Sequence, residues 1–275
     1  MVEKYIISLD LDGTLLNKKS KISFRTRFYL RRLAKKGHVV FINTGRPYSG
    51  CVHLYRKLGI YKYPLCCNNG AVIAFFKDKR STPTFETKPV DNKIMGELYE
   101  EIKPYSISGF ALDEYEHYFF NMNSVPPFIQ KYHKPKNPIF TTLEEITKIP
   151  VVSYTIYFDE INLDKVKNVL SNSKYNSLKQ IFWGVHDDGA SFNFASSEVS
   201  KATAIKRMQE LYNIDDEHVI AFGDSYNDID MLNYAKYGIC MRNGRIDMVK
   251  KANYITKKDN NHNGIVDYLK KNFNL

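Results

Sequence analysis

The chain has 275 residues, of which 43% are hydrophobic, and this is enough for two domains with a sizeable buried core. Its formal net charge is +10, but the basic residues are spread along helical faces and are not interleaved with aromatic residues. This distribution argues against a nucleic-acid partner. The positive field instead suits small phosphorylated molecules.

No stretch approaches a membrane-spanning length, and the first strand begins close to Met1 without a charged leader and an apolar signal core. We therefore expect a cytoplasmic protein without a membrane partner, and the oligomeric state stays unknown. The cysteines lack metal-ligand spacing and are predicted to be reduced structural thiols: Cys51, Cys66, Cys67 and Cys240.

The first predicted strand ends in two acids. The apolar run Tyr5-Ile6-Ile7 leads to Asp10 and Asp12, and Gly13 follows them directly. This pattern predicts a buried strand that opens into a tight turn, at the edge where α/β sheets place their chemistry. The two carboxylates leave the strand on one side, so they repel each other unless a cation or a shared proton relieves them. A divalent metal is one explanation, and an ordinary structural Asp-Gly turn is the other.

A helix is expected next, from Ser23 to about Lys36. Phe24, Phe28 and Leu33 are predicted to face the core, because they recur at helical spacing. The basic residues of this segment are predicted to form a solvated face: Arg25, Arg27, Arg31, Arg32, Lys35 and Lys36.

The second strand, from Val39, ends at a hydroxyl residue and a glycine. The Thr44 Oγ and the Gly45 backbone N–H suit hydrogen bonds to an anion. A shorter helix follows and is expected to stop at Gly59. Residues 65–73 then read as strand, turn and strand, in which Asn69 either lines the site or forms a plain hairpin turn.

A polar break at residues 77–81 is predicted to lead into an inserted domain. Core segments 1–82 and 188–275 would flank a mixed α/β insertion at 83–187, and the chain would return to the core near Ser191. Expected insertion elements are helices at 92–103 and 163–170, a helix start at Thr142, and strands at 118–122, 151–158 and 181–185. Candidates for leaving-group recognition, with surface or core packing as the favoured alternative, are Asp113, Glu114, Tyr118 and Trp183.

Two polar motifs lie in the last third of the chain. Lys201 opens a helical pattern, which sets its ammonium beside the positive end of that helix. The apolar strand Val219 to Gly223 ends in Asp224, Asn227 and Asp228. Helices and strands alternate from there to the last helix, near Gly264. This order predicts an α/β fold with a doubly wound parallel core sheet.

Taken together, these motifs resemble the haloacid dehalogenase-like phosphohydrolases, and within them the Cof-type sugar phosphatases with an α/β cap. The resemblance covers essentially the whole chain. It rests on four motifs in order: Asp10 to Thr14, Thr44 to Arg46, Lys201, and Gly223 to Asp228. The chain departs from the usual family pattern at Ala202 and at Arg242-Asn243-Gly244, which stands where Gly-Asn-Ala is more usual.

The resemblance implies a Mg²⁺-dependent phosphatase that forms an aspartyl-phosphate. Asp10 would be the nucleophile and Asp12 the general acid and base. The metal ligands would be the side chains of Asp10 and Asp224 and the backbone carbonyl of Asp12, with Asp228 in support. An all-oxygen ligand set favours Mg²⁺ over zinc. The remaining implied roles are phosphate binding by the Leu11 N–H, Thr44, Gly45, Lys201 and Asn227, orientation of Asp12 by Thr14, and support from Arg46.

The substrate would be a small phosphorylated metabolite, with sugar phosphates favoured. Two alternatives use similar residues. A phosphosugar mutase shares the aspartyl-phosphate but returns the phosphoryl group to a sugar. A phospho-receiver domain also pairs acids with Thr and Lys, but it needs neither the second acid at Asp12 nor an insertion of roughly a hundred residues.

Overall fold

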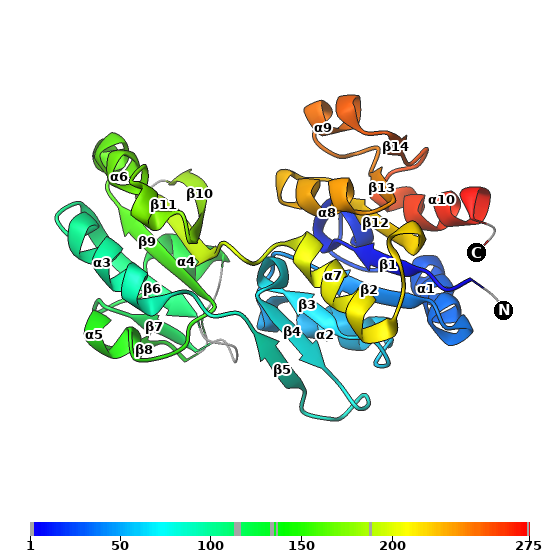
Figure 1. Cartoon of the computed structure of the whole chain (residues 1–275), viewed down its shortest axis with the longest axis horizontal. Coiled ribbons are helices and arrows are strands. Elements are labelled where there is room, and N and C mark those ends of the chain that lie inside the picture. The colour runs from blue at the N-terminus through cyan, green and yellow to red at the C-terminus, as the bar shows by residue number, and fades with distance from the viewer. Residues whose placement is uncertain (1–2, 113–116, 133–134, 136, 187–188, 274) are drawn as a thin grey trace. The chain divides into compact units, whose positions relative to one another are not determined.

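The computed structural model describes residues 3–112, 117–132, 135, 137–186, 189–273 and 275. The chain divides into two compact units, Met1–Glu86 with Ser200–Leu275 as the first and Thr87–Val199 as the second (Figure 1). None of the helices in the described ranges is both long enough and apolar enough to cross a membrane.

The first unit is built on an eight-stranded sheet in the order β14-β13-β12-β1-β2-β3-β4-β5. The pairs from β14 to β3 are parallel, whereas β3 and β4 are antiparallel. The strands are β1 (Ile6–Leu9), β2 (Val39–Asn43), β3 (Leu65–Cys67), β4 (Val72–Phe75), β5 (Thr84–Thr87), β12 (Val219–Gly223), β13 (Tyr237–Cys240) and β14 (Tyr254–Ile255). The predicted α/β class with a large parallel core sheet is confirmed.

Helices cover both faces of this sheet. On one face α7 and α8 pack on the sheet, with Ile205 and Met231 in one cluster with Ile6, Phe41 and Ala221. Residues of opposite parity point the other way, and the Phe222 ring meets Tyr268 of α10 there. The helices are α1 (Phe24–Lys36), α2 (Tyr48–Leu58), α7 (Lys201–Tyr212), α8 (Ile229–Tyr234), α9 (Ile246–Lys251) and α10 (Gly264–Asn272).

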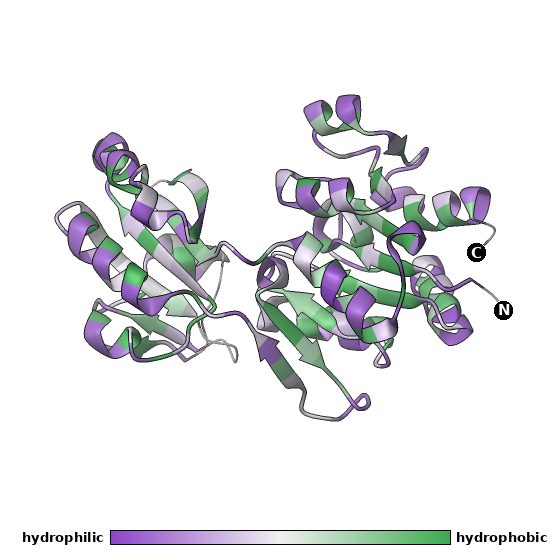
Figure 2. Cartoon of the chain, viewed as in Figure 1, coloured by the Kyte–Doolittle hydropathy of each residue, from purple (hydrophilic) through white to green (hydrophobic). Residues whose placement is uncertain are grey.

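Hydropathy follows this layering. In Figure 2 hydrophobic residues are concentrated on the central strands of the sheet, while both kinds alternate along the helices. The central strands β1, β2 and β12 are buried along their whole length. A strand buried on both faces reads as a continuous apolar run, which is why the sequence located these three strands well.

The expected core face of α1 was partly wrong. Leu33 is buried, but Phe24 and Phe28 are 74% and 62% exposed. The buried side instead carries Tyr29 and Leu30 with Leu33. Phe24 and Phe28 stack on each other at a centroid distance of 6.5 Å. The two rings therefore cover one another on the outer side of the helix and do not enter the core.

The second unit has a six-stranded sheet in the order β10-β11-β9-β6-β7-β8. Its core includes Leu98 of α3, Ile156 of β9 and Val166 of α6. The predicted helix at 163–170 is confirmed, and the Thr142 side chain accepts from the Glu145 N–H at the start of α5. The elements are α3 (Asn92–Ile102), β6 (Ser106–Leu112), β7 (Tyr118–Phe120), α4 (Pro127–Tyr132), β8 (Ile139–Phe140), α5 (Leu143–Ile146), β9 (Ser153–Phe158), α6 (Leu163–Leu170), β10 (Leu178–His186) and β11 (Gly189–Ser196).

The segment around Ser191 does not return to the first unit as expected. It forms β11, which pairs with β9 and β10 in the second sheet. Phe192 and Phe194 alternate with polar residues and join the core of that unit. The second unit therefore runs to Val199, beyond the expected boundary at residue 187.

Candidate active site

Three neighbouring strands end at the same edge of the first sheet. β1 pairs in parallel with β12 on one side and with β2 on the other. Asp10, Thr44 and Asp224 each follow the last residue of one of these strands. The parallel pairing thus brings together motifs that are far apart in the sequence, as ligand sites in open α/β sheets require.

A buried lysine lies between two acids at this edge. The Lys201 Nζ is 2.6 Å from Asp10 Oδ1 and 2.6 Å from Asp228 Oδ1. The side chains of Lys201 and Asp228 are fully buried, and that of Asp10 is 8% exposed. Lys201 is the first residue of α7, whose start is fixed by a capping box between Ser200 and Thr203.

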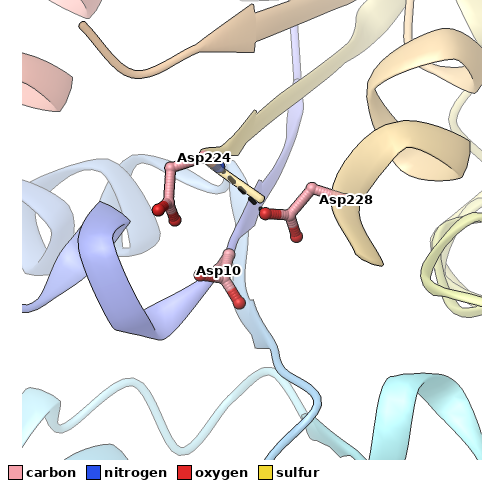
Figure 3. Close-up of side chains that lie close together, drawn as sticks. All are labelled: Asp10, Asp224 and Asp228. Atoms are coloured by element: carbon pink, nitrogen blue, oxygen red, sulfur yellow. Dashed lines mark hydrogen bonds between the residues drawn. The ribbon is translucent and has the colours of Figure 1, made fainter. Parts of the chain in front are cut away.

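Asp224 completes an acidic cluster. Asp10, Asp224 and Asp228 each present a carboxylate oxygen within 4.8 Å of the others, and Figure 3 shows these groups converging. The Oδ2 of Asp228 accepts the backbone N–H groups of Asp224 and Ser225 at 2.9 and 3.0 Å. The Thr14 hydroxyl, which was expected to orient Asp12, instead donates to Asp224 Oδ1 at 2.9 Å. Both oxygens of Asp228 thus accept hydrogen bonds from the protein. Asp10 accepts one from Lys201 through its Oδ1, and Asp224 accepts one from Thr14 through its Oδ1.

Burial sets the electrostatics of this cluster. Desolvation raises the pKa of Asp10 to about 7, against the attraction of Lys201 and with added repulsion from Asp228. Burial likewise raises the pKa of Asp224 to about 6, opposed by the Thr14 hydrogen bond. Desolvation works against the charge of Lys201, but Asp10 and Asp228 together raise its pKa above the usual value. The negative charge of three neighbouring carboxylates therefore exceeds the single positive charge of the Lys201 ammonium.

This set of groups fits a hard divalent cation. The nearby ligands are carboxylate oxygens, and Mg²⁺ prefers oxygen ligands. Lys201 and two backbone N–H groups already bond to the oxygens of Asp228. The Oδ2 atoms of Asp10 and Asp224 are therefore better placed as metal ligands. This supports the ligand roles expected from the sequence for Asp10 and Asp224, and a supporting role for Asp228.

Gly13 allows the turn after β1 to approach Asp224. Its φ is +75°, and a Cβ at this position would lie 2.2 Å from Asp224 Oδ2. A side chain here would therefore both strain the backbone and displace the carboxylate. The turn, Leu11–Leu15, also holds Leu11, which is buried.

The side chain of Asp12 does not join the acidic cluster. Its two oxygens accept from Nε and Nη2 of Arg46 at 2.6 and 2.5 Å. Arg46 also donates from Nη1 to the Gly50 carbonyl at 3.1 Å. The Asp12 side chain is 58% exposed, so the acid expected to act on the leaving group is at the surface of this unit.

Two of the expected phosphate-binding residues, Gly45 and Asn227, lie close to each other. Thr44 is buried, and its Oγ1 accepts the Arg46 N–H at 3.1 Å. Asn227 donates from Nδ2 to Asn69 Oδ1 at 3.3 Å. A Cβ added to Gly45 would lie within 3.2 Å of both amides. Asn69 therefore belongs to the turn between β3 and β4 and also lies beside Gly45 and Asn227.

Two site residues were not assigned from the sequence. Asn43 donates from Nδ2 to the Lys201 carbonyl at 2.8 Å and so fixes the start of α7. Asn243 donates from Nδ2 to the Gly13 carbonyl at 2.7 Å. A polar residue ending an apolar strand was the available signal for Asn43. For Asn243 the signal was the unusual tripeptide to which it belongs.

The candidates for leaving-group recognition lie in the second unit. Asp113 and Glu114 are outside the described residues. Tyr118 is buried in β7, and Trp183 is half-buried in β10. Tyr118 therefore packs in the core, which was the favoured alternative to leaving-group recognition.

The cysteines behave as predicted. Cys51, Cys66, Cys67 and Cys240 are all free and buried.

Comparison with known proteins identifies the family. Residues 7–269 match the family description haloacid dehalogenase-like hydrolase. The chain belongs to the haloacid dehalogenase-like hydrolases. The predicted family is therefore confirmed, and with it the expected enzyme class, a phosphoric monoester hydrolase.

Named relatives of this hydrolase are phosphatases. The 5-amino-6-(5-phospho-D-ribitylamino)uracil phosphatase YitU of Bacillus subtilis is 29% identical over 280 residues, covering 98% of each chain. The pyridoxal phosphate phosphatase YbhA of Escherichia coli is 25% identical, covering 96% of this chain and 97% of its own. A haloacid dehalogenase-like hydrolase from Bacteroides thetaiotaomicron has a crystal structure that matches with a TM-score of 0.78 at 26% identity, covering 98% of this chain and all of that one.

Proposed function

We propose that this hydrolase is a Mg²⁺-dependent phosphatase of small phosphate monoesters, acting through an aspartyl-phosphate. The observation that carries the proposal is the convergence of Asp10, Asp224 and Asp228 around the buried Lys201. Spontaneous hydrolysis of phosphate monoesters is extremely slow, so charge neutralisation and positioning must supply a large reduction of the barrier.

In the first step the Asp10 carboxylate attacks phosphorus, and the bond from phosphorus to the alcohol oxygen breaks. Asp12 gives its proton to that oxygen, so the alcohol leaves neutral. In the second step Asp12 takes a proton from water as the water oxygen attacks phosphorus. The bond to Asp10 then breaks, releasing inorganic phosphate and restoring both acids.

The phosphoryl oxygens are held by Lys201, the hydroxyl of Thr44, the backbone of Gly45 and Leu11, and Asn227. The side chains of Asp10 and Asp224 and the Asp12 carbonyl would hold Mg²⁺, which would supply positive charge to offset repulsion between the nucleophile and the phosphate. Thr14 orients Asp224 through its hydrogen bond, since the hydroxyl engages one oxygen and leaves the other for the ion.

The substrate class is part of this proposal. The two named relatives act on a ribityl phosphate and on pyridoxal phosphate, both phosphate esters of a primary alcohol on a small molecule. We assign sugar phosphates and similar metabolites to this chain.

Release of inorganic phosphate from a panel of sugar phosphates, pyridoxal phosphate and nucleotides tests the proposal. We expect turnover with Mg²⁺, loss of turnover with EDTA, and a loss of several orders of magnitude in Asp10→Asn. Asp164→Asn, which changes an exposed acid of α6, is the matched control. A near-normal rate in Asp10→Asn excludes the mechanism, and sugar isomers formed without free phosphate indicate a mutase.

Metal coordination is tested separately. Asp224→Ala is expected to raise the Mg²⁺ concentration for half-maximal activity at least tenfold, because a ligand is lost. An unchanged metal requirement removes Asp224 from the coordination shell.

A further inference from the structure

A concavity in the first unit is lined by residues other than the catalytic acids. It has a volume of about 380 Å³ and is lined by Arg242, Asn243, Lys257, Lys258, Asp259 and His262. The lining comes from the segments that follow the parallel neighbours β13 and β14. This volume is within the range of small-molecule sites.

The lining of this pocket is strongly basic. Arg242 donates from Nη1 to the Lys257 carbonyl at 3.1 Å, which anchors the guanidinium beside that lysine. Asp259 is the acid of the lining, and its Oδ1 accepts the His262 N–H at 2.9 Å and lies 2.6 Å from its Nδ1. Lys258 lies 3.3 Å from Asp267, outside the lining. The permanent positive charge of the pocket lining therefore exceeds its negative charge. The Asp259 carboxylate is engaged by His262 of the same turn.

One wall of the pocket is attached to the catalytic turn. Asn243 donates to the Gly13 carbonyl at 2.7 Å, and its Oδ1 accepts the Asn260 N–H at 3.0 Å. Asn260 in turn donates from Nδ2 to the Leu16 carbonyl at 2.6 Å. A ligand that moves the loop carrying Asn243 therefore also acts on the turn that contains Asp12 and Gly13.

We propose that this pocket binds a small oligophosphate anion and that Asn243 transmits its occupancy to the catalytic turn. The guanidinium of Arg242 offers paired N–H donors that match phosphate oxygens, and the ammonium of Lys257 adds a point charge on the same ligand. Several cations in one pocket suit an anion with more than one phosphate group. Free tripolyphosphate and the phosphate chain of a nucleotide share this chemistry.

Binding is measured directly, without reference to catalysis. Tripolyphosphate is titrated into the metal-free protein in EDTA while the ring signals of His262, assigned with His262→Gln, are followed by NMR. We expect saturable shifts and an apparent Kd at least tenfold weaker in Arg242→Ala and in Lys257→Ala. Lys35→Ala, an exposed lysine of α1, is the matched control. Unshifted His262 signals, or variants that bind like the wild type, overturn the site.

Two further arms define the ligand and its effect. Equal affinity for inorganic phosphate overturns the oligophosphate assignment, whereas tighter binding of ATP than of tripolyphosphate identifies a nucleotide as the source. With Mg²⁺ and a phosphate ester as substrate, saturating tripolyphosphate is expected to change kcat in the wild type and not in Lys257→Ala. An unchanged kcat in the wild type overturns the coupling through Asn243. Because the NMR arm needs no turnover, its result is independent of the proposed phosphatase activity.

Discussion

Arg46 holds Asp12 by two parallel hydrogen bonds, from Nε to Oδ2 at 2.6 Å and from Nη2 to Oδ1 at 2.5 Å. The pair connects the turn after β1 with the segment after β2, and the Gly50 carbonyl anchors the same guanidinium. A fork of this kind fixes the orientation of a carboxylate. Arg46 is thus a positioning residue for Asp12 while that side chain is a carboxylate, the form proposed to take a proton from water in the second step.

Loss of this fork is expected to affect catalysis more than substrate binding. Arg46→Ala should lower kcat about tenfold or more for a small phosphate ester while KM changes little, because a freely rotating Asp12 is rarely aligned. Arg46→Lys should recover only part of the rate, since an ammonium cannot form the paired contact. Steady-state kinetics with Arg56→Ala as the control measure both parameters. A rise in KM at constant kcat contradicts the positioning role.

The ion cluster at Lys201 makes a stability prediction. Lys201 and Asp228 are fully buried, so Lys201→Met leaves two acids without their cation and is expected to cost about 3 kcal/mol. Lys206→Met, an exposed site on the same helix, should cost far less. Urea unfolding measures the difference. Adding Asp228→Asn to Lys201→Met should restore part of the loss, and strictly additive losses exclude the coupling.

A single methyl group at Gly13 tests the close approach to Asp224. Gly13→Ala combines a positive φ with a Cβ 2.2 Å from Asp224 Oδ2, whereas a Cβ at Gly184 also has a positive φ but meets no described atom within 4 Å. Both substitutions should cost roughly 1 kcal/mol of backbone strain. Only Gly13→Ala should also raise the Mg²⁺ requirement, measured as activity against metal concentration. Equal metal requirements in the two variants contradict the proposed displacement of Asp224.

Local patterns were sufficient for the strands and turns around the site. Each central strand is a continuous apolar run that ends in polar residues, so Asp10, Thr44 and Asp224 could be placed at strand ends from the sequence. The start of α7 was likewise predicted, because Lys201 opens a helical pattern, and in the structure Ser200 and Thr203 form a capping box there. These signals depend only on residues that are neighbours in the sequence, so the sequence was enough to locate these strand ends and this helix start.

Contacts between distant segments were not predictable in the same way. The position of Lys201 between Asp10 and Asp228 depends on how α7 packs on the sheet. Phe24 and Phe28 have core-like spacing, but a pair of aromatic residues that stack on each other gives the same spacing. The segment that forms β11 is apolar at alternate positions and could belong to either sheet, so its partners β9 and β10 decide its unit.

His38 gives the stability of the first unit a dependence on pH. Its ring is buried and its Nδ1 accepts the Tyr5 N–H at 3.2 Å, which requires an unprotonated nitrogen. Burial, helped by the charge of Lys36, lowers the pKa of His38 below its usual value of 6.5. As the pH falls to about 6.5, His38 therefore takes up a proton in the unfolded chain while it is still unprotonated in the folded protein. The stabilisation is complete above that pH and is lost as the pH falls toward the folded pKa.

The expected result is a steeper fall in the free energy of unfolding in the wild type than in His38→Gln as the pH drops from 7.5 to about 5. Urea unfolding at several pH values measures both slopes, so a constant loss of stability in the variant does not enter the comparison. His53→Gln, at an exposed position of α2, should keep the wild-type slope. If His38→Gln and the wild type have the same slope, protonation of His38 does not limit stability in acid, and other groups account for the whole of the pH dependence.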